Sequence, residues 1–350
     1  MPPGRPLIRA RAPLRLALAG DGTDLAPYCD EFGGAALNVT IDRYAYAFIE
    51  PSEDGRVHFA ARDVGIEESF SPDPRLLRAA QLTMHSAVYR RMTANMRGEA
   101  RRPLRITTYA DAPPGAGLGS SSSMMVALVE AFRALLALPL GRYDLAHLAS
   151  DIERGDLGRA GGRQGYYAAA FGGANFIEFS AGDRVIVNPL RLEREVMNEL
   201  EASLVLCCTG ASRRAQAIIE EQQRRMAVPG SAALAALHEL KRDAIEMKQA
   251  LVRGEIRRMA EILNRSWQAK RRIATGVSTQ LIDDLYETAL SHGALAGKVS
   301  GAGGGGVVMF IVPPQQRITL IRALNEADAR AEGPHFTRQG AESWSLAGEA

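Results

Sequence analysis

The residues best suited to chemistry lie in a run of proline, glycine and serine, residues 113–123, with the sequence PPGAGLGSSSS. A strand-like segment, residues 104–109, precedes this run, and an apolar, helix-forming segment, residues 124–138, follows it. The first turn of a helix offers unpaired backbone N–H groups and the positive end of the helix dipole. Glycines also let a ligand approach the backbone closely. The run is therefore suited to hold a polyphosphate.

Two well-known phosphate loops do not fit this run. A Walker A loop needs a lysine directly after its last glycine, but Ser120 follows Gly119. The glycine spacing within residues 115–119 also differs from that of a dinucleotide-binding fingerprint. The alternative without a ligand is a glycine turn with a serine N-cap.

A second glycine-rich loop lies near the C-terminus, at residues 298–306, with the sequence KVSGAGGGG. It precedes an apolar strand-like segment, residues 307–312. Since six of its nine residues are Gly or Ala, a ligand or another stretch of backbone is expected to approach it closely. The alternative is a flexible turn.

The N-terminal segment 12–25 brings an arginine and an aspartate together, with Asp24 nine residues after Arg15. A carboxylate can accept hydrogen bonds from two neighbouring sugar hydroxyls. Taken alone, an Asx turn would explain Asp24 and a salt bridge would explain Arg15. Glu153, at the end of a predicted helix over residues 145–153, would by itself be an exposed helix acid.

These motifs resemble those of one kinase superfamily. Residues 113–123 follow the phosphate-loop pattern P-x-x-x-G-L-G-S-S-A-A of the GHMP kinases, with serines replacing the two alanines. Residues 298–306 resemble their motif K-x-x-G-A-G-x-G-G, and residues 12–25 resemble the first motif of their sugar-kinase members. Four shorter strings look like those of the D-glycero-α-D-manno-heptose 7-phosphate kinases: residues 35–44, 167–173, 209–213 and 293–298.

The resemblance implies an α+β fold with two lobes, residues 1–195 for the N-terminal ATP-binding domain and 196–350 for the C-terminal domain. The first lobe would resemble ribosomal protein S5 domain 2 and the second would be ferredoxin-like. The implied cofactors are ATP and Mg²⁺. Nucleotide phosphates would be held by Pro114, Gly115, Ala116, Gly117, Leu118, Gly119, Ser120 and Ser121.

The resemblance also assigns the remaining roles. Ser121 and Glu153 would hold Mg²⁺, which prefers few protein oxygens together with phosphate and water. Asp24 would orient the sugar, and Arg15 would offset charge on the transferred group; these two form the predicted catalytic pair. The predicted substrate-binding residues are Asp21, Gly22, Thr23, Asp24, Thr209, Arg213, Lys298, Gly301 and Gly303.

The chain departs from the family at two positions. Many members have a proposed catalytic base seven residues before a Gly-Gly pair, and the heptose kinases usually have K-Q-D-Q-Y there; this chain has glycine, Gly165. One explanation is that no base is needed, since phosphoryl transfer depends mainly on positioning and charge stabilisation. Otherwise Asp156, Asp21 or Asp24 serves instead, or catalysis is lost. Asp21 replaces the usual glycine, and either tunes the sugar site or is solvated.

A sugar phosphate also needs cations for its distal phosphate, for which arginine is well suited. The candidates are Arg213, Arg214, Lys270, Arg271, Arg272 and Lys298. Arg271 and Arg272 could equally lie on an exposed helix face, as we expect for at least one of them.

Periodicity predicts the elements that position these residues. Strands are expected at residues 7–18, 37–50, 57–61, 173–178, 200–208 and 307–312, and helices at 76–96, 145–153, 213–226, 231–264, 277–292 and 315–328. The remaining C-terminal tail is expected to be ordinary surface.

Composition narrows the class of protein. The length of 350 residues favours two lobes, and a formal net charge of +2 gives no argument for a nucleic-acid or membrane partner. No apolar run suits a membrane span or a signal peptide. Three cysteines and six histidines show neither a disulfide framework nor metal-ligand spacing. We expect a cytoplasmic protein, monomeric or a homo-oligomer, whose partners are a sugar phosphate and ATP.

Three functional hypotheses follow. The main one is an ATP- and Mg²⁺-dependent kinase that phosphorylates the anomeric hydroxyl of D-glycero-D-manno-heptose 7-phosphate, giving the 1,7-bisphosphate for GDP-heptose and surface polysaccharides. The second is a GHMP kinase for another sugar, such as fucose, mannose or galactose. The third is a nucleotide- or sugar-binding sensor without turnover, motivated by Gly165.

Overall fold

The computed structural model describes residues 7–73, 75–94, 103–113, 115–210 and 215–345. Within them the strands form a sheet of eight strands and a sheet of four. The larger sheet contains β1 (Ile8–Ala19), β2 (Gly34–Pro51), β3 (Val57–Ala61), β4 (Ile66–Phe70), β5 (Leu104–Ala110), β6 (Ala174–Ser180), β7 (Arg184–Pro189) and β12 (Glu342–Trp344). The smaller sheet contains β8 (Leu204–Cys208), β9 (Ala296–Val299), β10 (Val307–Ile311) and β11 (Arg330–Glu332).

The larger sheet has the strand order β12-β1-β2-β5-β3-β4, and β6 and β7 extend it beside β2. Its strand pairs are antiparallel except for β3 with β5. The long strand β2 pairs with β6 in its first half and with β5 in its second half. The smaller sheet has the order β11-β8-β10-β9 and is antiparallel.

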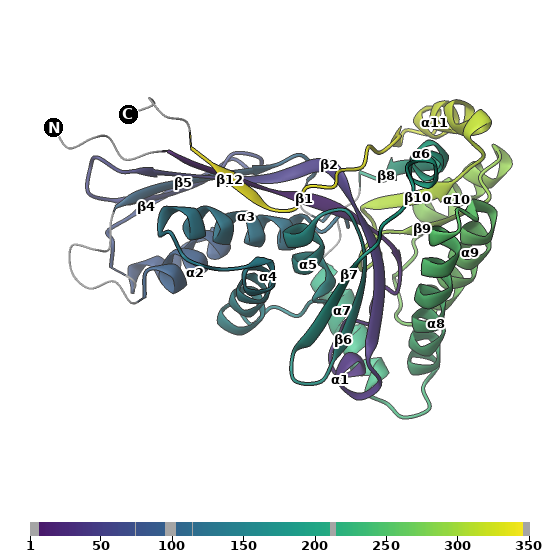
Figure 1. Cartoon of the computed structure of the whole chain (residues 1–350), viewed down its shortest axis with the longest axis horizontal. Coiled ribbons are helices and arrows are strands. Elements are labelled where there is room, and N and C mark those ends of the chain that lie inside the picture. The colour runs from purple at the N-terminus through teal and green to yellow at the C-terminus, as the bar shows by residue number, and fades with distance from the viewer. Residues whose placement is uncertain (1–6, 74, 95–102, 114, 211–214, 346–350) are drawn as a thin grey trace.

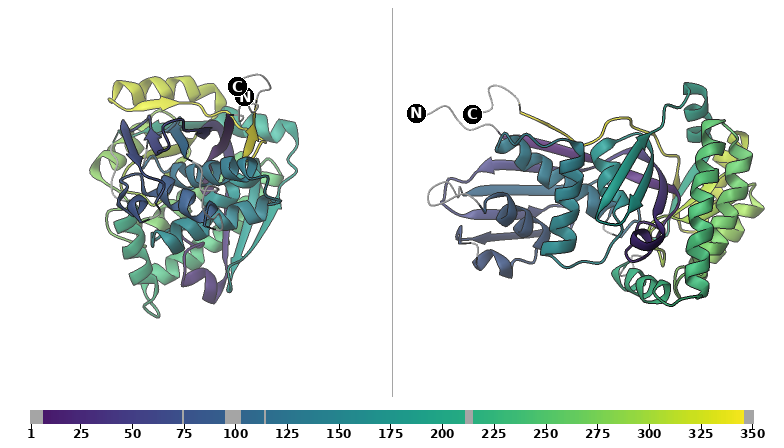
Figure 2. Two further views of the ribbon diagram at one scale, coloured as in Figure 1. Left: turned by 90° about the vertical axis from the view of Figure 1, so that its left-hand side faces the viewer. Right: turned by 60° about the horizontal axis from the view of Figure 1, so that its bottom comes forward.

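Helices cover both sheets (Figures 1 and 2). Figure 1 shows α2, α3, α4 and α5 against one face of the larger sheet, and α6, α8, α9, α10 and α11 around the smaller sheet. The helices are α1 (Tyr28–Phe32), α2 (Thr83–Met92), α3 (Ser120–Leu135), α4 (Arg142–Asp151), α5 (Gln164–Phe171), α6 (Arg194–Ser203), α7 (Ala215–Met226), α8 (Ala232–Val252), α9 (Ile256–Arg271), α10 (Gln280–Ser291) and α11 (Arg317–Glu326). Short 3₁₀ turns lie at Leu76–Ala79 and Pro314–Gln316, and a π turn at Ile152–Asp156.

Strand β1 passes from the outer part of the molecule into its centre. Burial alternates over its first residues, but Ala12 to Ala19 are buried without interruption. The reason is that the inner half of β1 packs against α3 on one side and against α8 and α9 on the other. A strand covered on both faces has a continuous apolar sequence, and the turn that follows β1 is thereby placed between the two layers.

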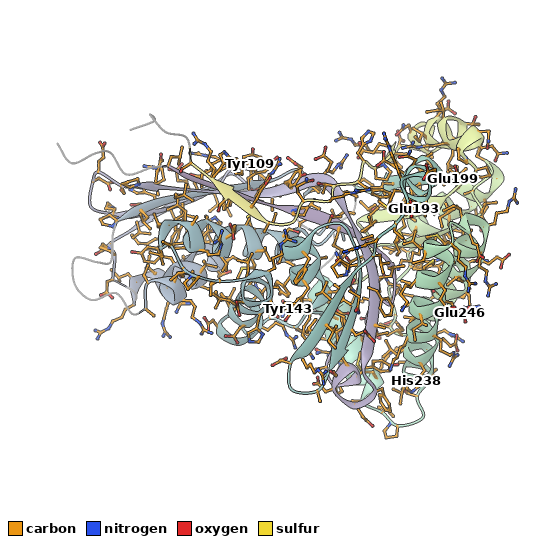
Figure 3. The ribbon with its side chains drawn as sticks, in the orientation of Figure 1. Tyr109, Tyr143, Glu193, Glu199, His238 and Glu246 are labelled. Atoms are coloured by element: carbon orange, nitrogen blue, oxygen red, sulfur yellow. The ribbon has the colours of Figure 1, made fainter. Side chains whose placement is uncertain are left out.

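In the described part of the chain, no helix covers one face of the outer part of the larger sheet (Figure 1). Aromatic side chains from β2 and β5 lie there, with the rings of Tyr46 and Tyr109 stacked at a centroid distance of 4.6 Å. Figure 3 labels Tyr109 at this face, whereas His238 and Glu246 lie on α8 in the other half of the molecule.

Several elements predicted from the sequence are confirmed, including the strands β1, β2, β3, β6 and β10 and the helices α7 and α11. The helix expected over residues 76–96 is wrong in its first part. A 3₁₀ turn ends at Ala79, and the backbone N–H of Gln81 then donates to the Glu68 carboxylate at 2.8 Å, so that α2 begins only at Thr83. Residues 95 and 96 lie outside the described residues.

Three other predictions need correction. The single helix expected over residues 231–264 is two helices, because Gly254 adopts a φ of 70° and ends the first of them. The strand expected from residue 200 begins at Leu204, since residues 194–203 form α6. The C-terminal tail is not ordinary surface: β12 pairs with β1, and Phe336 forms a bridge with Ile41 of β2.

The end of the chain therefore returns to the larger sheet, while the division at residues 195 and 196 stays a prediction. None of the helices in the described ranges is long and apolar enough to cross a membrane.

A buried histidine in the first layer leads to a stability prediction. His85 of α2 lies beside β5, with its Nε2 2.9 Å from the Thr108 hydroxyl, and burial lowers the pKa of this imidazole to about 4. In the unfolded chain the pKa of His85 has its ordinary value of 6.5, so the unfolded chain binds more protons than the folded protein between pH 6.5 and pH 4. The free energy of unfolding should therefore fall as the pH is lowered through this window, by roughly 3 kcal/mol from this group.

We predict that His85→Gln flattens this part of the pH dependence. Urea unfolding at several pH values between 4 and 7 measures the slope. The exposed residue His147 supplies the control, since His147→Gln should keep the wild-type slope. Equal slopes for all three proteins would contradict the assignment.

Candidate active site

The turn after β1 is shaped by contacts with the start of β2. The Thr23 hydroxyl lies 2.8 Å from both Gly20 O and Ala35 O, and it accepts the Ala35 N–H. Gly20 has a φ of 84°, and a Cβ there would lie 2.0 Å from Ala35 O, so only glycine fits. Thr23 is fully buried and serves the turn, which presents Asp21 and Asp24 to the interior.

The two glycine-rich loops pack directly against one another. A Cβ at Gly117 would lie 2.3 Å from Ser300 O, and one at Gly301 would lie 2.9 Å from Gly117 Cα. The Ser300 hydroxyl donates to Gly117 O at 2.8 Å, and the Val307 N–H donates to Ala116 O at 2.9 Å. The close approach that the second loop predicts is therefore, at least in part, an approach of backbone to backbone.

Arg15 contacts the first glycine-rich loop, residues 113–123, and keeps one side-chain donor unpaired among the described residues. Its guanidinium donates to Gly117 O at 2.9 Å, and its backbone N–H donates to Leu118 O at 2.9 Å. Arg15 Nε and the Ser120 hydroxyl are buried and have no hydrogen-bond partner among the described residues. Two unpaired donors beside Gly119, at the start of α3, fit an anionic ligand such as a nucleotide phosphate.

Ser121 and Glu153, predicted as a metal pair, are adjacent in the structure. The Ser121 hydroxyl donates to Glu153 Oε1 at 2.5 Å, and the Tyr166 hydroxyl donates to Glu153 Oε2 at 2.7 Å. Burial, and then the charge of Glu153, raises the pKa of the Tyr166 phenol well above its usual value, so the phenol stays a donor. One hydroxyl and one carboxylate oxygen fit Mg²⁺ that takes its other ligands from phosphate and water.

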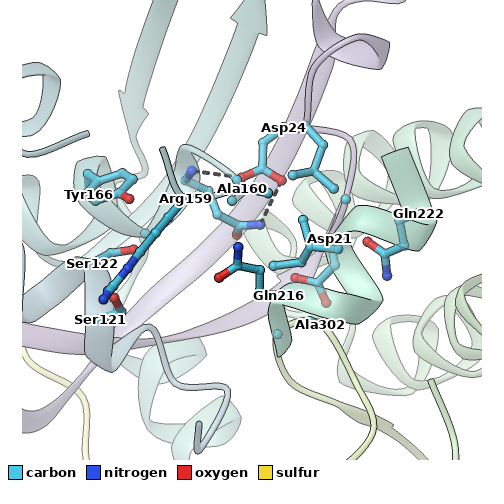
Figure 4. Close-up of a pocket in the computed structure, with 18 of the residues that line it drawn as sticks. Asp21, Asp24, Ser121, Ser122, Arg159, Ala160, Tyr166, Gln216, Gln222 and Ala302 are labelled. Atoms are coloured by element: carbon cyan, nitrogen blue, oxygen red, sulfur yellow. Dashed lines mark hydrogen bonds between the residues drawn. The ribbon is translucent and has the colours of Figure 1, made fainter. Parts of the chain in front are cut away.

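These residues line a cavity of about 380 Å³ (Figure 4). Arg15, Asp21, Asp24, Ser121 and Glu153 all contribute to its wall, as do Gly22 and Gly301. Asp24 is buried, and its Oδ2 accepts the Gln164 N–H at 2.9 Å. A Cβ at Gly162 would lie 2.2 Å from Asp24 Oδ2, so any larger residue at this position would clash with the Asp24 carboxylate.

Asp21 is not solvated but forms a buried ion cluster. Its Oδ2 accepts from Lys270 Nζ at 2.9 Å and from Lys298 Nζ at 2.7 Å. Burial raises the pKa of Asp21, but the charges of both lysines and of Arg15 outweigh it and hold the pKa well below its usual range. Burial lowers the pKa of Lys270 to about 8. Asp21, Lys270 and Lys298 are called the Asp21 cluster below.

Several predicted residues lie away from the cavity wall. Lys298 is buried in the Asp21 cluster, the Thr209 N–H donates to Gly306 O, and Gly303 packs against Val277. These placements do not support direct substrate contacts, and the same holds for Thr23. Pro114, Arg213 and Arg214 lie outside the described residues.

Two other phosphate candidates are on the surface. Arg271 pairs with Asp283, and Arg272 pairs with Glu239, so both lie on an exposed helix face.

Among the residues of the cavity wall that were not predicted from the sequence are Ser122, Arg159, Tyr166 and Gln222. Arg159 approaches Glu153 Oε1 at 3.5 Å from a segment without periodicity, so no pattern indicated it. The sequence pattern could have indicated Gln222. It lies between Ile218 and Met226 on the buried stripe of α7, where an apolar residue is expected.

Gly165 lies in the cavity wall as well, in α5. A Cβ at this position would lie 2.6 Å from the Ser122 Oγ and 2.8 Å from the Ser122 Cβ. The glycine thus leaves the space that the Ser122 side chain uses.

Comparison with known proteins defines the class of this protein. The family model described as GHMP kinases N terminal domain matches residues 82–173, and the one described as GHMP kinases C terminal matches residues 247–329. A D-glycero-alpha-D-manno-heptose 7-phosphate kinase of Campylobacter jejuni is 40% identical over 341 residues, which are 97% of this chain and 99% of the relative. The chain belongs to the GHMP kinases, which are phosphotransferases with an alcohol group as acceptor.

Solved structures agree with this assignment. A D-glycero-D-manno-heptose 1-phosphate kinase of Bacteroides thetaiotaomicron superimposes with a TM-score of 0.82 at 39% identity, covering 97% of this chain and 99% of the other. The galactokinase of Lactococcus lactis, at 19% identity and a TM-score of 0.72, covers 96% and 95% and shows the same fold.

The contact between Gly165 and Ser122 gives a prediction. Gly165→Asp, which restores the usual residue, should lower the melting temperature, because overpacking costs about 1–3 kcal/mol. Ser122→Ala removes the nearest atom, so the double variant should lose less stability than the sum of the two single variants. Thermal unfolding of the four proteins measures this coupling, and strict additivity would contradict the clash.

Proposed function

We propose that this chain transfers the γ-phosphoryl group of Mg·ATP to the anomeric hydroxyl of D-glycero-D-manno-heptose 7-phosphate. The observation that carries the proposal is the meeting of Arg15, Asp24, Ser121 and Glu153 in one cavity beside the two glycine loops. The relative from C. jejuni, named as a heptose 7-phosphate kinase, supports the choice of substrate. The product would serve the synthesis of GDP-heptose for surface polysaccharides in the cytoplasm.

In this proposal each residue has a defined task. Backbone N–H groups from Gly115 to Ser121, with Arg15 Nε, bind the nucleotide phosphates. Ser121 and Glu153 hold Mg²⁺, which supplies charge neutralisation at the transferred phosphoryl group when bound. Tyr166 fixes Glu153 by its hydrogen bond at 2.7 Å. Asp24 accepts sugar hydroxyls, because its Oδ1 is held only weakly, at 3.4 Å from Gln164 Nε2.

Because Gly165 carries no carboxylate, the remaining candidates for a catalytic base are Asp156, Asp21 and Asp24. Asp156 pairs with Arg91 at 2.9 Å and is not part of the cavity wall. Asp21 is a weak base, because the lysines hold its pKa low. Of the three alternatives we therefore propose Asp24 as the acceptor of the proton of the reacting hydroxyl, unless transfer proceeds by positioning and charge stabilisation without a base.

One observation favours the second hypothesis, a GHMP kinase for another sugar. Lys270 and Lys298, two candidates for the distal phosphate, are occupied by Asp21. A substrate without a second phosphate, such as fucose, mannose or galactose, would not need them.

The first test is ADP release from Mg·ATP with heptose 7-phosphate, mannose 6-phosphate, mannose, fucose and galactose. Turnover confined to heptose 7-phosphate is expected. Turnover only with an unphosphorylated sugar would favour the second hypothesis. Thermal stabilisation by ATP without ADP from any sugar would favour a sensor without turnover.

Glu153→Gln tests the metal site. The amide keeps the size of the side chain but loses its charge, so kcat should fall about 100-fold or more, as for other lost transition-state contacts. Circular dichroism should show an unchanged fold. Asp156→Asn is the matched control and should keep kcat, and near-normal turnover of Glu153→Gln would remove this residue from the site.

A further inference from the structure

One end of the cavity has no role in the proposed phosphoryl transfer. It is formed by Asp21, Gly22, Ile219, Gln222 and Lys270, and is called the α7 end below. Figure 4 shows Asp21 and Gln222 on the side of the cavity opposite Ser121, Ser122 and Tyr166. A sugar whose reacting hydroxyl lies near Glu153 and whose other hydroxyls reach Asp24 would extend toward this end.

Gln222 is an unpartnered amide in the wall of the α7 end. The residue is only 4% exposed and lines the cavity, and none of the hydrogen bonds among the described residues involves its amide. Its neighbours on α7 differ in this respect: Gln223 donates to Ala26 O at 3.0 Å, and Gln216 donates to Glu220 at 3.1 Å. Since Gln222 lines the cavity, a ligand there can reach this amide. A ligand that both donates and accepts, as a hydroxyl does, would satisfy both atoms of this amide.

Asp21 adds an acceptor and, among the described residues, engages both Lys270 and Lys298. Its Oδ2 accepts from both lysines, whereas its Oδ1 has no hydrogen bond with the described residues. The ammonium of Lys270 has all three donors engaged, by Asp21, Val299 O and Gly301 O. A hydroxyl can donate to Asp21 here, but a phosphate would meet a carboxylate, and Lys270 would have no donor to offer it.

We propose that Asp21 and Gln222 form a second sugar-binding locus that takes uncharged hydroxyl groups and excludes a phosphate from the α7 end. Asp21 thereby determines specificity, because it binds Lys270 and Lys298 inside the protein. These two cations would otherwise attract an anion. The inference rests on the proposed function in so far as the ligand is the sugar substrate. The ring hydroxyls face the α7 end, and a phosphate-bearing arm of a heptose leaves the cavity by another side.

The first experiment compares Gln222→Leu with the wild type, and Gln223→Leu as the matched control. The KM for the sugar, and its Kd by calorimetry without ATP, should rise about 10-fold in Gln222→Leu, the factor that one hydrogen bond is worth. The KM for ATP and the melting temperature should stay close to the wild-type values. Gln222→Ala provides a second variant should the leucine fail to fold.

Deoxy sugars give a readout that a structural role would not change. One analogue that lacks a single ring hydroxyl should bind the wild type about 10-fold more weakly than the parent sugar, yet bind Gln222→Leu as well as the parent does. Unchanged sugar affinity in the variants, or the same penalty for every analogue in both proteins, would overturn the locus.

The second experiment tests the exclusion of phosphate with inorganic sulfate as the probe. Asp21→Gly removes the internal carboxylate, so sulfate should raise the melting temperature of this variant more than that of the wild type. Asp21→Asn, which keeps the side-chain size, should respond in the same direction. An equal response of all three proteins would overturn the exclusion.

These results separate the inference from the proposed function. A wild type that binds a sugar through Gln222 without phosphorylating heptose 7-phosphate would contradict the proposed function and leave the inference standing. Turnover of heptose 7-phosphate with unchanged kinetics in Gln222→Leu would support the proposed function and contradict the inference. Binding of no sugar at all would overturn both.

Discussion

The active site depends on one buried carboxylate. Asp21 binds Lys270 of α9 and Lys298 of β9, and so ties the turn after β1 to the helix layer and to the smaller sheet. Charges buried to this degree need partners, because removing one partner from a buried pair typically costs about 3–5 kcal/mol. The same turn carries Asp24 and begins where β1, the strand of Arg15, ends. The ion cluster therefore sets the position of the groups around the cavity as well as its charge.

A second constraint is the contact between the two glycine loops. Gly117 and Gly301 approach so closely that neither could carry a side chain without displacing the other backbone. Their contact leaves Gly117 O to accept from both Arg15 and Ser300. Within the described residues, Arg15 Nε and the Ser120 hydroxyl remain unpaired donors, which is the arrangement expected where an anion binds.

Much of the site could be predicted from local patterns. The spacing of Arg15 and Asp24, the serine Ser121 of the glycine and serine run, and Glu153 near a helix end indicated residues that the fold brings to one cavity. The long apolar strands were also recognisable, because continuous burial produces a continuous apolar sequence.

Other features were not predictable, since they depend on partners distant in sequence. Glu68 accepts the backbone N–H of Gln81 just before α2 begins, and residues 342–344 pair with β1 as strand β12. Lys298 was predicted as a phosphate ligand, but its actual partner, Asp21, lies 277 residues away in the chain. Arg159 approaches Glu153 from a segment with no pattern at all.

The sequence by itself determined the class of protein, the two glycine-rich loops, and the residue types available for chemistry, since these follow from short motifs and their spacing. Only the tertiary structure decided which of those groups are free to bind a ligand. Hydrogen bonds and charges are satisfied in space: Asp21 engages two lysines, Thr23 holds a turn, and Gln222, on an apolar stripe, has no hydrogen bond within the described part of the chain. The selectivity of the cavity thus depends on packing between layers, which no local pattern encodes.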